Sequence, residues 1–110
     1  MNVKQFKKFL DRDGGCVHCG DVETAVPHHR ANRGMGGSKK RDVPSNIVSM
    51  CSLINGLMES DAYTAELART YGWKVSTNTD SSLVPVWYPN RGAWFLIDDE
   101  YTIREVGKDD

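Results

Sequence analysis

Apolar residues at the start of the chain recur with the spacing of an amphipathic helix. They are Val3, Phe6, Phe9 and Leu10, and lysines occupy much of the remaining surface. Glycines follow at positions 14 and 15, and glycine commonly ends a helix. The pattern therefore predicts a short helix that ends before residue 14.

The middle of the chain changes from a strand pattern to a helical one. The β-branched stretch 47–50 follows a Pro-Ser-Asn turn and predicts a short strand. Helical spacing then extends from Ser52 to Tyr71, but the pair at positions 60 and 61 is typical of an internal N-cap, and Gly72 is typical of the position after a helix. We expect two consecutive helices here.

Three strand-like runs occupy the C-terminal part of the chain, at residues 84–88, 93–97 and 101–106. Turn signals separate them, which predicts an antiparallel meander over about residues 84–106. Its aromatic side chains alternate, and such stripes more often cover a core than stack on bases, so we expect one face to pack on the helices. These side chains are Trp87, Tyr88, Trp94 and Phe95.

The chain has 110 residues, of which 39% are hydrophobic and 26% are charged. These values indicate one globular domain over residues 1–110 with a modest core. No apolar run reaches the length of a membrane span, and the first ten residues lack the apolar stretch of a signal peptide. We therefore expect a cytoplasmic protein without membrane contact.

The formal net charge of -1 conceals a polarised chain. Residues 1–41 contain nine Lys or Arg and four Asp or Glu, whereas residues 42–110 contain five and eleven. The basic excess of the first part indicates nucleic-acid contact on that side, with the acidic tail facing away from the phosphates.

Three cysteines exclude a disulfide framework, because they cannot all pair and a cytoplasmic chain keeps them reduced. Cys16 and Cys19 enclose a tight turn followed by glycine, which is the form of a zinc knuckle. Taken alone, this spacing is also that of a redox pair, but the βαβ context of thiol redox folds is missing.

Further polar residues follow the knuckle in a fixed order: His28 and His29, then Asn46, Cys51 and Asn55. Each of them alone has an ordinary structural explanation. Adjacent histidines on an extended strand point to opposite sides unless the chain twists, so they are typical of two surface imidazoles. An Asn after a Pro-Ser pair is typical of a turn.

Together, the order and spacing of these residues resemble the HNH endonucleases, which are also called ββα-metal or His-Me finger nucleases. The resemblance is to the small HNH proteins of bacteriophages in particular, and it covers most of the chain from Phe9 onward. The residues that carry it lie at 16–20, 28–38, 44–51, 55–60, 71–76 and 84–86.

The resemblance implies roles for four residues. His29 is the general base that takes a proton from the attacking water, which suits an imidazole because imidazoles titrate near neutral pH. His28 and Asn55 hold a divalent metal, and Asn46 clamps the loop between the strands through backbone hydrogen bonds. The family name leads one to expect His at position 55, and an amide oxygen there favours Mg²⁺ or Mn²⁺ over Zn²⁺.

Many HNH proteins also hold a structural Zn²⁺ between two Cys-x2-Cys knuckles. Cys16, Cys19 and Cys51 remain in this chain, but Ile54 stands where the second knuckle has its second thiol. Three thiolates hold Zn²⁺ with a fourth ligand from elsewhere, for which His18 is a strained candidate. Without zinc, the three cysteines pack as small apolar residues, and both interpretations stay open.

Basic residues close to the proposed base are expected to contact DNA phosphates without reading sequence, unless they form only a solvated loop. They are Arg30, Arg33, Lys39, Lys40 and Arg41.

The sequence thus predicts an α+β fold with an N-terminal helix, a ββα-metal finger over about residues 16–59, a further helix and a C-terminal antiparallel meander. The predicted function is a metal-dependent DNA endonuclease that nicks DNA as a monomer, in the host cytoplasm if a phage encodes it. Because Asn55 departs from His, a second interpretation is a catalytically weak descendant that binds DNA, or a phage or host protein.

Overall fold

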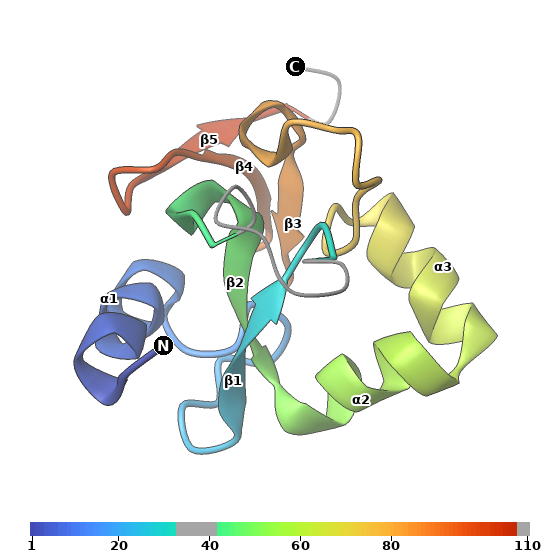
Figure 1. Cartoon of the computed structure of the whole chain (residues 1–110), viewed down its shortest axis with the longest axis horizontal. Coiled ribbons are helices and arrows are strands. Elements are labelled where there is room, and N and C mark those ends of the chain that lie inside the picture. The colour runs from blue at the N-terminus through green and yellow to red at the C-terminus, as the bar shows by residue number, and fades with distance from the viewer. Residues whose placement is uncertain (33–41, 108–110) are drawn as a thin grey trace.

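Three α-helices and two small antiparallel sheets make up the described part of the chain, which is residues 1–32 and 42–107 of a computed structural model (Figure 1). The fold class is therefore α+β, as the sequence predicts. The elements are α1 (Val3–Asp13), β1 (Ala25–His29), the 3-10 turn η1 (Pro44–Asn46), β2 (Ile47–Cys51), α2 (Ser52–Ser60), α3 (Ala62–Thr70), the 3-10 turn η2 (Ser81–Leu83), β3 (Val86–Tyr88), β4 (Ala93–Ile97) and β5 (Ile103–Val106).

Helix α1 begins and ends at residues whose chemistry explains its limits. The side chain of Asn2 accepts a hydrogen bond from the backbone N–H of Gln5, which satisfies a donor in the first turn. Gly14 ends the helix in the left-handed conformation, at φ 73°. The predicted N-terminal helix is confirmed.

The predicted break between the two central helices is also confirmed. Helix α2 ends at Ser60, and Asp61 caps α3 by accepting a hydrogen bond from the backbone N–H of Thr64. Gly72 follows α3 with φ +76°, and a Cβ at this position would lie 2.1 Å from the carbonyl oxygen of Pro85. Only glycine fits there, so the chain can turn and pass directly under the second sheet.

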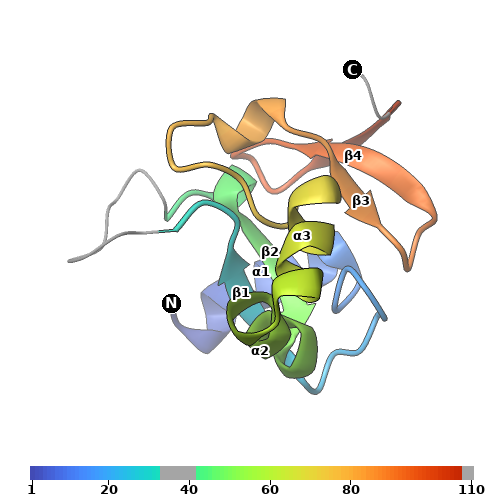
Figure 2. The same cartoon turned by 90° about the vertical axis from the view of Figure 1, so that its right-hand side faces the viewer.

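The first sheet consists of β1 and β2, which pair antiparallel with Ala25 opposite Cys51 and His29 opposite Ile47. Helix α1 lies on one side of this hairpin, and α2 and α3 lie on the other (Figures 1 and 2). Because β2 continues into α2 without a loop, residues of the first turns of α2 are held close to β1.

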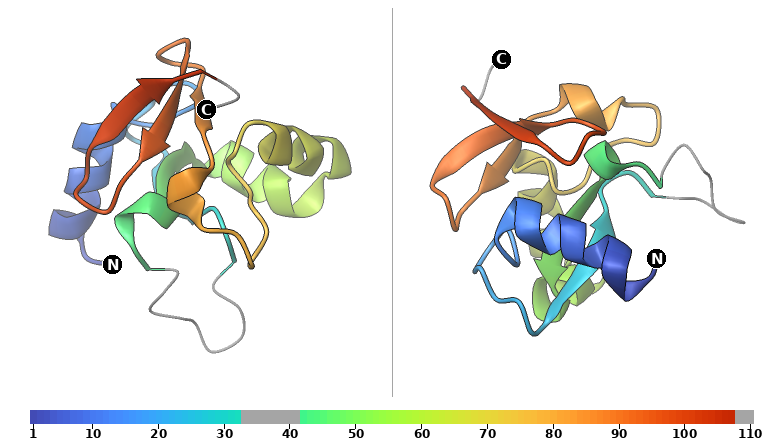
Figure 3. Two further views of the ribbon diagram at one scale, coloured as in Figure 1. Left: turned by 90° about the horizontal axis from the view of Figure 1, so that it is seen from above. Right: turned by 90° about the vertical axis from the view of Figure 1, so that its left-hand side faces the viewer.

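The second sheet has the strand order β3-β4-β5, which is the predicted meander. Tyr88 and Phe95 point into the core with their rings 5.0 Å apart, whereas Trp87 and Trp94 are half-buried on the other face. The meander lies over α1 on one side and faces the helix pair α2–α3 on the other (Figure 3).

A buried polar network joins α1 to both sheets. The guanidinium of Arg12 donates two hydrogen bonds to the carboxylate of Asp13, at 2.7 and 3.1 Å, and the hydroxyl of Tyr88 donates to the same carboxylate at 2.7 Å. The backbone N–H of Ser49 in β2 donates to Asp13 at 2.8 Å.

No helix in the described residues is both long enough and apolar enough to cross a membrane.

Candidate functional site

The hairpin β1–β2 and the helix that follows it bring together two residues that are 27 positions apart in the sequence. The Nδ1 atom of His28, on β1, lies 3.0 Å from the Oδ1 atom of Asn55, on α2. The imidazole is buried, with 6% of its residue surface exposed, and the amide is half-buried. The two residues that the resemblance assigns to a metal are therefore neighbours in space.

The second ring nitrogen of His28 determines the protonation state of the first. Its Nε2 lies 2.7 Å from the carbonyl oxygen of Trp73, which only accepts, so Nε2 carries the proton. Burial lowers the pKa of His28, although the bonds to Trp73 and Asn55 oppose this shift. The ring is therefore neutral near pH 7, and Nδ1 presents a lone pair to Asn55.

Two arrangements satisfy this pair. Either the Asn55 amide is turned so that its NH₂ group donates to Nδ1, or both acceptor atoms share a cation. The observed separation of 3.0 Å is that of an ordinary hydrogen bond and also that of two adjacent ligands of one octahedral cation, so it fits both arrangements. A metal-bound His commonly donates its other N–H to a backbone carbonyl, as His28 does to Trp73.

Sequence reasoning missed a carboxylate close to this pair. Glu59 lies one helical turn after Asn55, and its charge acts on the ring of His28. Its Oε1 atom is 3.3 Å from the Nζ atom of Lys74, which follows Trp73 directly. The i, i+4 spacing of Asn55 and Glu59 on a helix was the available signal, because such residues share one helix face.

Asn46 makes the backbone hydrogen bonds that the resemblance implies. Its Oδ1 accepts from the N–H of Ala31 at 2.8 Å, and its Nδ2 donates to the carbonyl of Ala31 at 3.0 Å. The hydroxyl of Ser81 donates to the same Oδ1 at 2.6 Å. The side chain is 2% exposed, so this amide joins the end of β1, the start of β2 and η2 from inside the molecule.

His29 lies in different surroundings from His28. Its Nε2 is 2.7 Å from the Oδ1 atom of Asp42, and both side chains are partly exposed. It lines a cleft of about 310 Å³ together with Met1, Gln5 and Ile47, and neither His28 nor Asn55 borders this cleft. The alternation of side chains along β1 thus separates the two histidines, which the resemblance assigned to one site.

Arg30 requires a correction, because the sequence predicts that it contacts DNA phosphates. Its side chain is buried, with 1% of the residue exposed, and all of its described hydrogen bonds are to backbone carbonyls. The acceptors are the carbonyl oxygens of Gly72, Ser45, Ser81 and Val84, at 2.7 to 2.9 Å. Burial lowers the pKa of Arg30 to about 10, so it stays charged at neutral pH.

The other predicted phosphate contacts lie outside the described residues; they are Arg33, Lys39, Lys40 and Arg41.

The acidic tail also lies closer to the proposed site than the sequence predicts. A carboxylate oxygen of Asp99 accepts from the backbone N–H of Ser45 at 2.9 Å, next to Asn46. Asp99 and Asp80 border one cleft together with Asn46. This part of the tail therefore faces the segment that carries Asn46.

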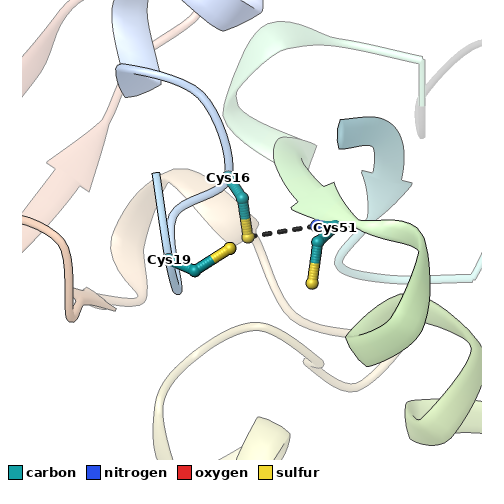
Figure 4. A group of neighbouring side chains, drawn as sticks. All are labelled: Cys16, Cys19 and Cys51. Carbon is teal, nitrogen blue, oxygen red and sulfur yellow. Dashed lines mark hydrogen bonds between the residues drawn. The ribbon is translucent and has the colours of Figure 1, made fainter. Parts of the chain in front are cut away.

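The three cysteines form a cluster that could hold a metal such as zinc. Two of them precede β1 in the sequence, and the third is the last residue of β2. The sulfur atoms of Cys16, Cys19 and Cys51 all lie within 4.8 Å of one another (Figure 4). Backbone N–H groups of Cys51 and His18 donate to the sulfur of Cys16 at 3.0 and 3.3 Å. Among the described residues no histidine or carboxylate completes the group, and the ring of His18 packs edge-on against Trp73 instead.

No protein-family model matches this chain, and neither the curated proteins nor the solved structures contain a match to it.

Proposed function

We propose that this protein is a metal-dependent DNA endonuclease of the HNH type, built on the ββα unit of β1, β2 and α2. The observation that carries the proposal is the contact between the His28 and Asn55 side chains, whose Nδ1 and Oδ1 atoms lie 3.0 Å apart. The hydrogen bonds of Asn46 to Ala31 support it, because they stabilise the chain directly after β1.

The chain's own residues supply the remaining chemistry. Nε2 of His29 lies 2.7 Å from a carboxylate oxygen of Asp42, so Nδ1 is the ring nitrogen that would take a proton from water. The water oxygen attacks phosphorus, the bond to the 3′ oxygen breaks, and the products carry a 3′ hydroxyl and a 5′ phosphate. His28 and Asn55 would hold a Mg²⁺ or Mn²⁺ ion, which would supply positive charge against the negative charge that develops on the phosphate.

Cleavage of supercoiled plasmid with Mg²⁺ or Mn²⁺ tests this proposal. We expect nicked circles to form before linear DNA, because one chain carries one site. His29→Ala should lower the rate about 100-fold or more, since loss of a general base has effects of this size. Asn55→Ala should also lower it, whereas Lys7→Gln on the exposed surface of α1 should not. Equal rates for the wild type, His29→Ala and Asn55→Ala contradict the proposal.

A second candidate function is binding of DNA or of a phage or host protein without catalysis. The observation that favours it is the separation of His29 from the His28–Asn55 pair by the β1 strand. In that case, binding survives the His29→Ala substitution and no divalent ion stimulates cleavage. The plasmid assay and a binding assay on the same preparations distinguish the two functions.

We also propose that Cys16, Cys19 and Cys51 hold a structural Zn²⁺. Ile54 occupies the position of the missing fourth thiol and packs against the core cluster that contains Cys16 and Cys51. Ile54→Cys should therefore complete a four-thiolate site and slow zinc loss to a chelator, while Cys19→Ser should reduce the zinc content measured by mass spectrometry. Zinc-free wild-type protein, purified from zinc-containing medium, contradicts this part of the proposal.

A further inference from the structure

One cleft among the described residues lies directly after the backbone carbonyl of Trp73, which accepts from His28. It has a volume of about 580 Å³ and lies among the end of α3, the loop after Trp73 and the segment that follows β1. The backbone N–H of Val75 donates to the carbonyl of Arg30, which attaches this loop to the end of β1 (Figure 2). The cleft begins at Lys74, one residue after the carbonyl that accepts from His28.

The lining of this cleft has the chemistry of a phosphate-binding surface. Two cations, an amide and three hydroxyl groups border it, and these are the groups that bind sugar and phosphate oxygens in protein–DNA complexes. They belong to Arg69, Lys74, Asn32, Ser76, Thr77 and Thr79. Asn32 is also the last described residue before the basic stretch 33–41 of the sequence.

Both cations already have a carboxylate partner, but these pairs are weak. Lys74 is 3.3 Å from Glu59, and Arg69 is 3.7 Å from Glu66, with both carboxylates mostly exposed. The Arg69–Glu66 pair is exposed at both ends and contributes at most about 1 kcal/mol. In the other pair Glu59 is exposed, whereas 16% of the Lys74 side chain is exposed. A phosphate can therefore replace Glu59 or Glu66 as the partner of the cation.

The other clefts fit a polyanion less well. The cleft next to Asn46 is bordered by the carboxylates of Asp80 and Asp99. The cleft at His29 contains Asp42 and, among its described lining residues, no Lys or Arg. A hollow on α1 carries Lys4 and Lys8, but Lys8 lies over the ring of Tyr101. Helix α1 is also on the opposite side of the hairpin from α2, the helix that contains Asn55 (Figure 1).

We infer that the cleft between Lys74 and Asn32 binds the sugar-phosphate backbone of DNA that flanks the scissile phosphate. This inference rests on the proposed nuclease function, because it takes the His28–Asn55 pair as the position of the scissile phosphate. Lys74 and Arg69 contact phosphates, and the hydroxyl groups and Asn32 donate to phosphate and sugar oxygens. The DNA strand then runs from the His28–Asn55 pair along the loop of residues 74–79.

Binding of a fluorescein-labelled DNA duplex, measured by anisotropy in EDTA over a range of salt concentrations, tests this inference apart from catalysis. Lys74→Gln and Arg69→Gln should each weaken binding about tenfold at about 0.1 M salt and reduce the slope of log affinity against log salt by about one. Glu59→Gln should strengthen binding, because it removes a carboxylate that competes for Lys74. Lys7→Gln, which removes an exposed ion-paired lysine from α1, serves as the matched control and should leave the slope unchanged.

The outcomes separate this inference from the proposed function. If Lys74→Gln and Arg69→Gln keep the wild-type affinity and slope while the wild type cleaves plasmid, the cleft assignment is overturned and the nuclease stands. If both variants lose affinity as expected but no preparation cleaves DNA, the cleft assignment stands and the nuclease is overturned. If Lys8→Gln reduces the slope and Lys74→Gln does not, DNA binds on the α1 side instead. Thermal unfolding of each variant checks that the fold is retained.

Discussion

The two sides of β1 differ in burial, in hydrogen-bond partners and in exposure to solvent. On one side, His28 is buried, both of its ring nitrogens have partners, and Arg30 next to it donates only to backbone carbonyls. On the other side, His29 faces a cleft that opens to solvent, and its described partner is the partly exposed carboxylate of Asp42. The His28 side is stabilised by contacts between residues distant in the sequence, whereas the His29 side has a hydrogen bond at the surface.

This difference shows how adjacent residues on one strand can have different environments and so different functions. Side chains alternate along a strand, and the proposed metal-binding pair lies on the face that packs against α2, where packing holds its side chains in place. A proton acceptor must exchange protons with water, which the more exposed face allows. A change on one side of β1 should therefore differ in its effect from a matched change on the other side.

The largest effect is expected from Arg30 on the buried side. Arg30→Met removes the donors for four backbone carbonyls, and we expect the free energy of unfolding to fall by about 3–5 kcal/mol. Arg30→Lys keeps the charge but fewer hydrogen bonds, so it should lie between Met and the wild type. Urea denaturation of these variants gives the values.

His29→Met is the matched change on the exposed side and should lower the free energy of unfolding by less than about 1 kcal/mol. A loss of similar size for Arg30→Met and His29→Met would show that the two sides of β1 do not differ in the way the contacts indicate.

The next largest effect is expected for the affinity for a divalent metal, which should differ between variants of the two histidines. We expect His28→Ala and Asn55→Ala to weaken Mn²⁺ binding about 100-fold or more, because loss of an outer-sphere partner alone costs about 10- to 100-fold. His29→Ala should leave Mn²⁺ binding within about twofold of the wild type. Calorimetric titration with Mn²⁺ measures all three. Equal weakening by His28→Ala and His29→Ala would place both histidines at one ion and so remove the distinction.

The secondary structure could be predicted from the sequence because its signals are local. Helix α1 ends at a glycine, Asp61 separates α2 from α3 as an N-cap, and turn residues separate the three strands of the meander. The interactions of Asn46 followed from a motif in which spacing and residue type are fixed. For the helices and the meander, the residues that determine the structure lie within a few positions of one another, whereas the bonds of Asn46 to Ala31 span 15 positions and follow from the motif alone.

The environment of the site could not be predicted, because residues distant in the sequence create it. Arg30 appeared to be a phosphate ligand because it follows His29, but its acceptors include Gly72 and Val84, more than forty residues later. The carbonyl of Trp73 that sets the protonation state of His28 also comes from a separate loop. No local pattern shows which side chain such a loop will cover.

The pH dependence of stability should report on the buried ring of His28. Burial lowers the pKa of His28 below its value of about 6.5 in the unfolded chain, so the unfolded state binds more protons. The neutral ring therefore stabilises the fold above about pH 6.5, and this stability is lost as the pH falls toward the folded pKa, by at most about 1.4 kcal/mol per pH unit. Glu59 and Lys74 are the charged groups that act on this ring.

Urea denaturation in EDTA between about pH 8 and pH 5 measures this effect by difference. His28→Gln should be less stable than the wild type at pH 8 and should approach it as the pH falls. A constant difference between wild type and His28→Gln at every pH contradicts the assignment of a buried neutral ring to His28.

The smallest effect is expected for the pair of His29 and Asp42. Their atoms are 2.7 Å apart, but 41% of the Asp42 side chain is exposed, so water and salt weaken the interaction. A double-mutant cycle with His29→Gln and Asp42→Asn should give a coupling free energy below about 1 kcal/mol, which decreases further in high salt. The cycle isolates this pair from the other interactions of Asp42. A coupling of about 3 kcal/mol that is insensitive to salt would mean that the His29 side is as desolvated as the His28 side, and His29 would then be a structural residue rather than one placed to exchange protons with water.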